Sequence, residues 1–154
     1  MELNKKSYDD LKIGEDILSM QNITKIYGNG FIANKNVNFT VRKGEIHGLV
    51  GENGAGKTTL MKVLFGQEIP EEGRILLAGK EVNIPNPLAA LEYGIGMVHQ
   101  HFMLVESLSV AENMVLGSEP VKGIAFDYEE AIRRTKEVSK KFDLEVNPKA
   151  IIRD

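Results

Sequence analysis

The sequence predicts an α/β fold, because strand and helix patterns alternate and a glycine-rich turn joins one strand to one helix. Two strand patterns come first, then the strand, turn and helix, and then further strands and helices. The chain has 154 residues, of which 42% are hydrophobic and 27% charged, which is the size and composition of one globular domain.

Strand patterns dominate the first third of the chain. Residues 1–15 are polar and lack a clear period, so we expect a flexible lead-in there. Apolar spacing indicates a strand over 17–26, and alternation of apolar with polar residues indicates a half-buried strand over 37–41. A mostly apolar run that leads into glycine predicts another strand over 46–50.

The remaining strands are expected where short apolar runs lie between turn residues, and the helices where apolar residues recur at helical spacing. Ser109 and Glu112 have the spacing of a capping box, and Asp127 and Glu130 repeat it. The strands expected are 75–77, 82–84 and 95–98, and the helices expected are 57–65, 87–93, 110–116 and one that starts after Asp127.

Composition excludes several classes of site. The net charge of −3 lacks the basic excess of nucleic-acid-binding domains, so no nucleic-acid partner is expected. The absence of cysteine excludes disulfides, zinc–thiolate sites and cysteine nucleophiles, and it is consistent with a reducing cytoplasm. No run of about 18 apolar residues occurs, so we expect any membrane association to come through a partner.

One segment carries a clear chemical pattern, G-x-x-x-x-G-K-[ST], the phosphate-binding loop. Its glycines allow the backbone to approach an anion closely, its amide groups point inward, and the helix that follows adds the positive end of its dipole. The loop therefore predicts ATP binding. The residues that match the pattern are Gly51, Glu52, Asn53, Gly54, Ala55, Gly56, Lys57 and Thr58.

The side chains at the end of the loop have separate predicted roles. Lys57 is expected to reach the β- and γ-phosphates and so to act in catalysis. The Thr58 hydroxyl is expected to ligate Mg²⁺, and Thr59 to donate near the α-phosphate. The alternative is a structural glycine-rich turn with a surface lysine; Gly54, the Lys-Thr pair and the flanking strand and helix patterns argue against it.

Two segments carry a family resemblance. GLVGENGAGKTTLMKVLFG resembles the Walker A region of ABC-transporter ATPases, and GIGMVHQHFMLVESLSVAENMVLG resembles their Q-loop region. The likeness is strongest to importers of simple sugars and nucleosides, whose ATPase is commonly two fused domains. It implies a P-loop NTPase fold of the ABC ATPase type, with a mixed sheet around the P-loop helix, an antiparallel front subdomain and the start of a helical subdomain.

The resemblance also assigns residues outside the loop. Tyr27 stands where the family places an aromatic ring on adenine, although a core or surface tyrosine is the alternative. Gln100 matches the glutamine that contacts Mg²⁺ and the attacking water, so it is expected to be both a catalytic and a metal residue. Residues 101–112 resemble the surface that receives the permease. His99 and His101 would share one face of a strand, but no third metal ligand is evident.

The signature motif, the Walker B aspartate, the catalytic glutamate and the switch histidine of the family do not occur up to Asp154. We therefore expect residues 16–154 to be part of one nucleotide-binding domain, a fragment that is inactive as an ATPase by itself. The full-length parent would be the active ATPase.

The resemblance implies an ATP-binding subunit that couples hydrolysis of ATP, with Mg²⁺, to import of sugars or nucleosides. Its implied partners are transmembrane permease subunits, a second ATPase domain in a homodimer or a fused tandem, and indirectly an extracellular substrate-binding protein. Its implied location is cytoplasmic, at the inner face of the cell membrane. The alternatives are a soluble ABC ATPase of DNA repair or ribosomes, a small P-loop kinase, and a nucleotide-binding module without turnover.

Overall fold

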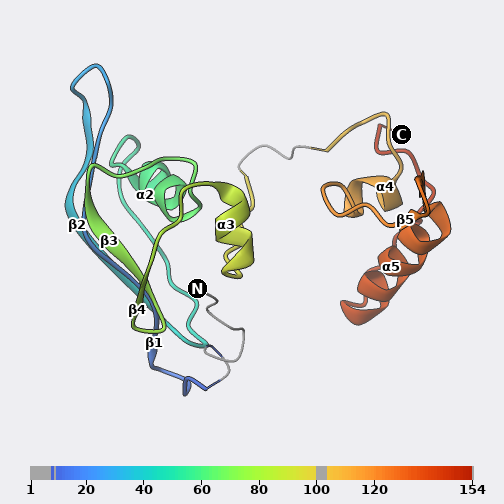
Figure 1. The fold of residues 1–154 in the computed structure, drawn as a ribbon, viewed down its shortest axis with the longest axis horizontal. Helices are drawn as coiled ribbons and strands as arrows, with labels where there is room; N and C mark the ends of the chain where they lie inside the picture. Colours follow the sequence, from blue (N-terminus) through green and yellow to red (C-terminus); the bar gives the residue numbers. More distant parts are fainter. Residues whose placement is uncertain (1–7, 9, 100–103, 154) are drawn as a thin grey trace. The chain divides into compact units, whose positions relative to one another are not determined.

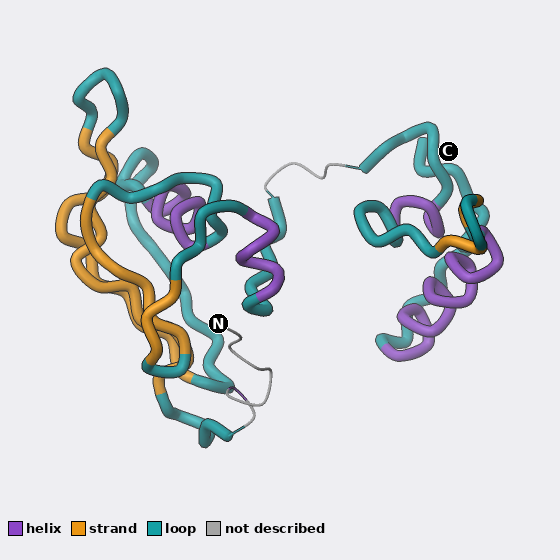
Figure 2. The backbone as a smooth tube through the Cα atoms, viewed as in Figure 1, coloured by secondary structure: helices purple, strands orange, loops and turns teal. Residues whose placement is uncertain are grey.

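The computed structural model describes Tyr8 and residues 10–99 and 104–153. The chain divides into two compact units, Met1–Met97 and Val98–Asp154. Figure 1 follows the chain from the blue N-terminal part to the red C-terminal part, and Figure 2 marks its helices and strands. The predicted phosphate-binding loop belongs to the first unit.

A four-stranded antiparallel sheet is the framework of the first unit, with strand order β2-β1-β3-β4. The structure confirms the strands predicted over 17–26, 37–41 and 75–77. The long β1–β2 hairpin stands out in Figure 2. The strands are β1 (Asp16–Ile26), β2 (Ile32–Arg42), β3 (Glu72–Leu77) and β4 (Lys80–Val82).

The position of β4 differs from the strand predicted over 82–84. Ala78 and Gly79 have φ of 49° and 75°, the positive angles that a tight two-residue hairpin turn of type I′ requires. This turn places Lys80 directly opposite Leu77. The ladder therefore begins immediately after the turn, earlier than the apolar run alone suggested.

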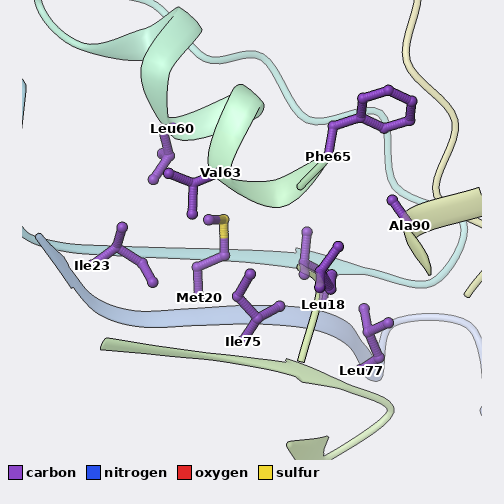
Figure 3. Close-up of a cluster of buried hydrophobic side chains, with 10 residues drawn as sticks. Leu18, Met20, Ile23, Leu60, Val63, Phe65, Ile75, Leu77 and Ala90 are labelled. Carbon is purple, nitrogen blue, oxygen red and sulfur yellow. The ribbon is translucent and has the colours of Figure 1, made fainter. Parts of the chain in front are cut away.

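The core of the first unit lies between the sheet and α2 (Lys57–Leu64), the helix predicted over 57–65. Leu60 and Val63 lie on one side of α2, and Figure 3 shows them above Met20 of β1. Burying an apolar side chain of this size contributes about 1.5–3 kcal/mol. The buried residues of this core are Leu18, Met20, Ile23, Leu60, Val63, Phe65, Ile75, Leu77, Ile84 and Ala90.

A second helix of this unit, α3 (Pro87–Glu92), begins at the predicted Pro87 and ends one residue before the predicted 93. The side chain of Asn86 accepts a hydrogen bond from the Ala89 N–H at 2.9 Å. Pro87 occupies the first turn, where its missing N–H has no helical acceptor. Gly94, with φ 79°, follows the end of the helix. The predicted helix is thus confirmed.

The strands predicted over 46–50 and 95–98 are wrong. In the part of the chain that the structure describes, neither segment belongs to a sheet. Ile46 and Val50 have relative exposures of 101% and 93%, and Val98 has 85%. A strand is held by hydrogen bonds to a neighbouring strand, and an apolar run does not supply that neighbour.

The second unit packs two helices against each other. Their contact is made by small and apolar side chains, and α4 and α5 are seen at the orange and red end of Figure 1. No helix in the described ranges is both long enough and apolar enough to cross a bilayer. The elements are α4 (Val110–Met114), β5 (Val121–Lys122), β6 (Ala125–Phe126) and α5 (Tyr128–Lys141), and the buried residues are Ala111, Val115 and Ala131.

Both helices of this unit start at the predicted capping residues. The Ser109 Oγ accepts from the Glu112 N–H at 3.3 Å, and the Glu112 Oε2 accepts from the Ser109 N–H at 2.8 Å. At α5, the Asp127 carboxylate accepts from the Glu130 N–H at 3.0 Å. Helix α4 ends at Met114, short of the predicted 116, a difference within the usual scatter of helix ends.

Candidate functional site

The loop 51–58 joins the segment after β2 to the N-terminus of α2. Gly54 and Gly56 have φ of 84° and 81°, a left-handed conformation that residues with a side chain rarely adopt. Between them, the Ala55 N–H donates to the Glu52 carbonyl oxygen at 3.2 Å. The backbone therefore bends sharply and enters the helix directly.

Gly56 also packs against β2 more closely than any other residue type would allow. A Cβ atom at this position would lie 2.2 Å from the Ala33 carbonyl oxygen and 2.6 Å from the Asn34 Nδ2. The Asn34 amide, which is 6% exposed, donates to the Gly56 carbonyl oxygen at 3.2 Å. The loop is therefore anchored on the sheet. Sequence reasoning missed Asn34, because its contact depends on this close approach.

The N-terminus of α2 is free of the groups that usually occupy a helix start. Its N-cap residue is Gly56, no side chain caps it, and its first turn holds no acidic residue. The first helical hydrogen bond runs from the Leu60 N–H to the Gly56 carbonyl oxygen at 2.9 Å. The N–H groups of Lys57, Thr58 and Thr59 thus have no acceptor within the helix. Together with the helix dipole, this arrangement suits an anion.

Lys57 bends back over the loop. Its Nζ atom donates to the carbonyl oxygens of Gly51 and Glu52, each at 2.7 Å. An ammonium group carries three N–H donors, so it can exchange these neutral acceptors for phosphate oxygens, which bind a cation more strongly. The structure therefore holds the lysine charge at the mouth of the loop.

A cavity of about 290 Å³ opens on the loop. Most of the predicted phosphate-binding residues line it, together with two residues from the start of β2 and the turn before it. The lining residues are Phe31, Ala33, Asn53, Gly54, Ala55, Gly56, Lys57, Thr58 and Thr59. The backbone, one ammonium and two hydroxyl groups thus converge on one hollow.

Tyr27 lies beside the loop at the end of β1. Its hydroxyl is 3.4 Å from the Thr59 Oγ1 and donates to the Glu68 Oε1 at 3.4 Å. Its ring is 6.5 Å, centroid to centroid, from the ring of Phe31, with an interplanar angle of 20°. Phe31 lines the cavity and Tyr27 does not. Sequence reasoning missed Phe31, because its place across the hairpin from Tyr27 depends on the register of β1 and β2.

The buried side chain of Lys25 holds the segment that contains Glu68, the hydrogen-bond partner of Tyr27. The Lys25 Nζ donates to the Ile69 carbonyl oxygen at 2.7 Å and to the Glu71 Oε1 at 3.1 Å, and it lies 3.6 Å from the Glu68 Oε2. Burial lowers the pKa of Lys25, but the two glutamates outweigh burial and raise it. Lys25 therefore stays charged and fixes Glu68, the acceptor of the Tyr27 hydroxyl.

A larger cavity, of about 560 Å³, lies along α2 and the β3–β4 hairpin. Its charged groups, Arg74 and Glu81, are paired with each other at 3.8 Å. It has neither a glycine loop nor a helix N-terminus among its lining residues, so its chemistry does not suit a phosphate chain. The smaller cavity is the candidate site.

The structure brings together the predicted residues of the loop, with Thr59 and Tyr27 beside them. Gln100, the predicted partner of Mg²⁺ and of the attacking water, lies outside the described residues, as does His101. The roles of all these residues stay predictions, since the geometry fixes their positions and not their ligands.

Comparisons with known proteins agree with this geometry. A model of the ABC transporter family matches residues 34–153. The nucleoside import ATP-binding protein NupA of Lactococcus lactis subsp. cremoris (strain MG1363) is 49% identical over 140 residues, which are 91% of this chain and 28% of that protein. The galactose/methyl galactoside import ATP-binding protein MglA of Escherichia coli (strain K12) is 45% identical over 137 residues, 89% of this chain and 27% of that protein. The chain thus spans less than a third of the length of these relatives.

Solved structures agree as well. A nucleotide-free ATP-binding cassette from an ABC transporter matches with a TM-score of 0.76 and 25% identity, over 90% of this chain and 58% of that chain. The ADP conformation of MJ1267, an ATP-binding cassette of an ABC transporter, matches with a TM-score of 0.74 and 26% identity, over the same shares. These likenesses confirm the predicted α/β fold of the ABC ATPase type, and with the family match they show that this chain belongs to the ABC transporter family.

Proposed function

We propose that this chain is the nucleotide-holding part of an ATP-binding subunit, which couples ATP binding and hydrolysis to solute import by an ABC transporter. The observation that carries this proposal is the uncapped N-terminus of α2, reached through a loop in which Gly56 has a left-handed backbone against β2. Such a loop offers several N–H donors to one polyphosphate.

The residues of the loop fit a triphosphate with Mg²⁺. Lys57 would bind the β- and γ-phosphates in place of its two carbonyl acceptors. The Thr58 hydroxyl, a hard oxygen donor that lines the cavity, would bind Mg²⁺, and Thr59 would donate near the α-phosphate. Gln100 would be the second residue at the metal and the water. Bound Mg²⁺ would neutralise charge on the phosphate oxygens.

The domain organisation belongs to the same proposal. Residues 1–15 form a lead-in, and residues 16–154 are part of one nucleotide-binding domain. Tyr8 and residues 10–15 do make backbone contacts: the Lys43 Nζ donates to the carbonyl oxygens of Tyr8 and Leu11, each at 2.8 Å. We propose that ATP hydrolysis belongs to the whole subunit, and we expect none from this chain by itself.

The partners and substrates follow from the relatives. Their names describe import of nucleosides and of galactose or methyl galactoside, and we propose a sugar or nucleoside as the transported solute here. The proposed partners are permease subunits, a second ATPase domain and, indirectly, an extracellular binding protein. The subunit would work at the cytoplasmic face of the membrane through its permease.

Isothermal titration calorimetry with ATP and Mg²⁺ tests the nucleotide site. We expect the chain to bind ATP and the Lys57→Ala variant to lose at least about tenfold in affinity, since charge-assisted bonds to phosphate are strong. Lys62→Ala is the matched control, because Lys62 lies in the last turn of the same helix and should leave binding unchanged. Equal affinities of the chain and the Lys57→Ala variant would contradict the proposal.

A further inference from the structure

Phe31 is a large exposed aromatic side chain on the wall of the phosphate-loop cavity. Its relative exposure is 54%, and it shares the cavity with the loop glycines and Lys57. Single exposed apolar residues are common on protein surfaces. Phe31 is distinguished by its position, because an apolar ring beside an otherwise polar phosphate cradle offers a surface to the base of the same nucleotide.

The hairpin between β1 and β2 sets the position of this ring. The Tyr27 N–H donates to the Phe31 carbonyl oxygen at 2.9 Å, and the Gly30 N–H donates to the Tyr27 carbonyl oxygen at 2.8 Å. The first bond continues the pairing of Ile26 with Ile32, and the second closes the turn. Tyr27 and Phe31 thus lie across the hairpin from each other, and the side chains of such a cross-strand pair leave the same face. The backbone therefore holds both aromatic residues on one face, beside the loop.

The two rings are nearly parallel. Their centroids are 6.5 Å apart and their planes differ by 20°. A flat base in van der Waals contact with a ring on either side needs about 7 Å between those rings, since carbon atoms touch at about 3.5 Å. The centroid separation of 6.5 Å is below that value, so the rings must move apart to admit a base. The Phe31 ring, which is 54% exposed, can rotate outward into solvent while Tyr27 stays in place.

Tyr27 is the fixed member of the pair. Its hydroxyl contacts Thr59 and Glu68, and Glu68 is in turn held by the buried Lys25. The Lys25 Nζ also lies 5.6 Å from the centroid of the Tyr27 ring. Because Thr59 belongs to the first turn of α2, this contact ties the position of the aromatic pair to the phosphate loop.

We propose that Phe31 is a second base-contacting residue, and that Tyr27 and Phe31 together form an aromatic clamp for the purine of the bound nucleotide. This inference rests on the proposed nucleotide site and adds to it a residue that sets base preference. Stacking on aromatic side chains is favourable for every base. It grows with the area of contact, so the clamp favours the two-ring purines over pyrimidines.

The test is calorimetric titration of the chain and its Phe31 variants with ATP, CTP and inorganic tripolyphosphate, each with Mg²⁺. Phe31→Ala and Phe31→Leu should weaken ATP binding roughly tenfold, weaken CTP binding less and leave tripolyphosphate binding within about twofold. Phe31→Tyr keeps a ring and should retain ATP affinity. Phe142→Ala is the matched control, because Phe142 is similarly exposed, at 61%, and lies in the other unit.

The outcomes distinguish failure of the aromatic clamp from failure of the proposed nucleotide site. Unchanged ATP affinity in both Phe31→Ala and Phe31→Leu would overturn the clamp and leave the phosphate site standing. Equal losses for ATP and tripolyphosphate would also overturn it, because Phe31 would then support the loop and not the base. Failure of the unaltered chain to bind either ligand would overturn the proposed function, and the clamp with it.

Discussion

The ammonium nitrogen of Lys57 lies 2.7 Å from the carbonyl oxygen of Gly51, the first residue of its own loop. A second bond of equal length reaches Glu52. The Lys57 side chain therefore reaches back across the loop from position 57 to the first loop residue, Gly51. A bound phosphate must attract this group away from two good acceptors, so both charge and reach matter at this position.

Substitution of Lys57 by arginine separates charge from reach. Arginine keeps the positive charge, but its donors lie in a rigid planar fork, whereas the lysine ammonium is compact. We expect Lys57→Arg to weaken ATP binding by roughly tenfold or more, because the guanidinium donors would not reach the phosphate oxygens in the geometry of the ammonium group. Calorimetry gives the comparison, and an arginine variant that binds as tightly as the parent chain would show that charge alone suffices.

The two left-handed glycines of the loop should differ in their tolerance of a side chain. A Cβ at Gly54 meets nothing within 4 Å, whereas one at Gly56 overlaps the Ala33 carbonyl oxygen at 2.2 Å. Gly54→Ala should cost only the backbone strain, ~1–2 kcal/mol. Gly56→Ala should cost a further ~1–3 kcal/mol from overpacking. Urea unfolding measures both, and equal free-energy losses would argue against the close packing.

The capping box of α4 predicts a dependence of stability on pH. The Ser109 hydroxyl and N–H both donate to Glu112 and hold the pKa of its carboxyl below the usual value of 4.5. A carboxyl with a lower pKa in the folded state stabilises that state above pH 4.5, and this contribution is lost as the pH falls through the folded-state pKa. Stability should therefore decline below about pH 4.5.

Glu112→Gln is the matched variant for this effect, since glutamine also completes a capping box but does not titrate. Thermal unfolding of the two chains between pH 7 and pH 3 gives the comparison. The decline should be shallower in Glu112→Gln. Identical pH profiles would place the acid sensitivity elsewhere in the chain.

The segment 46–50 predicts self-association. Ile46 and Val50 are fully or almost fully exposed, with relative exposures of 101% and 93%, and exposed apolar runs with unpaired backbone invite pairing with another chain. We expect the apparent mass in sedimentation equilibrium to rise with concentration. The double variant Ile46→Ser, Val50→Ser should reduce this rise.

Ile124→Ser provides the control for that experiment. Ile124 is as exposed, at 107%, but it lies in the turn between β5 and β6 and not in an extended apolar run. Its replacement should leave the association unchanged. If the apparent mass of the unaltered chain stays constant with concentration, the chain does not self-associate and this prediction is wrong.

The features that the sequence predicts well are local. The capping residues Ser109 and Asp127 act within one helical turn, and the loop 51–58 is defined by its own residue types, so short patterns suffice. The first two strands and α2 follow from periodicity over one element. Tyr27 was identified by its place in a family pattern, and the structure puts its hydroxyl 3.4 Å from the Thr59 hydroxyl.

The features that the sequence does not predict depend on distant contacts. The segments 46–50 and 95–98 have the apolar character of strands, but pairing needs a neighbour that the run itself does not specify. The anchoring bond of Asn34 exists because the loop folds onto β2. Phe31 becomes part of the site because the register of β1 and β2 places it across the hairpin from Tyr27, and the sequence does not specify that register.

The proposed nucleotide site depends on the backbone amides of the loop and of the first turn of α2, which would hold the polyphosphate. Titration of ¹⁵N-labelled chain with tripolyphosphate and Mg²⁺, followed by amide NMR shifts, tests it most directly. We expect the amide signals of residues 54–59 to shift and saturate together, and Lys57→Ala to weaken this response. Signals of residues 54–59 that stay in place, while ligand-induced shifts gather elsewhere, would contradict it.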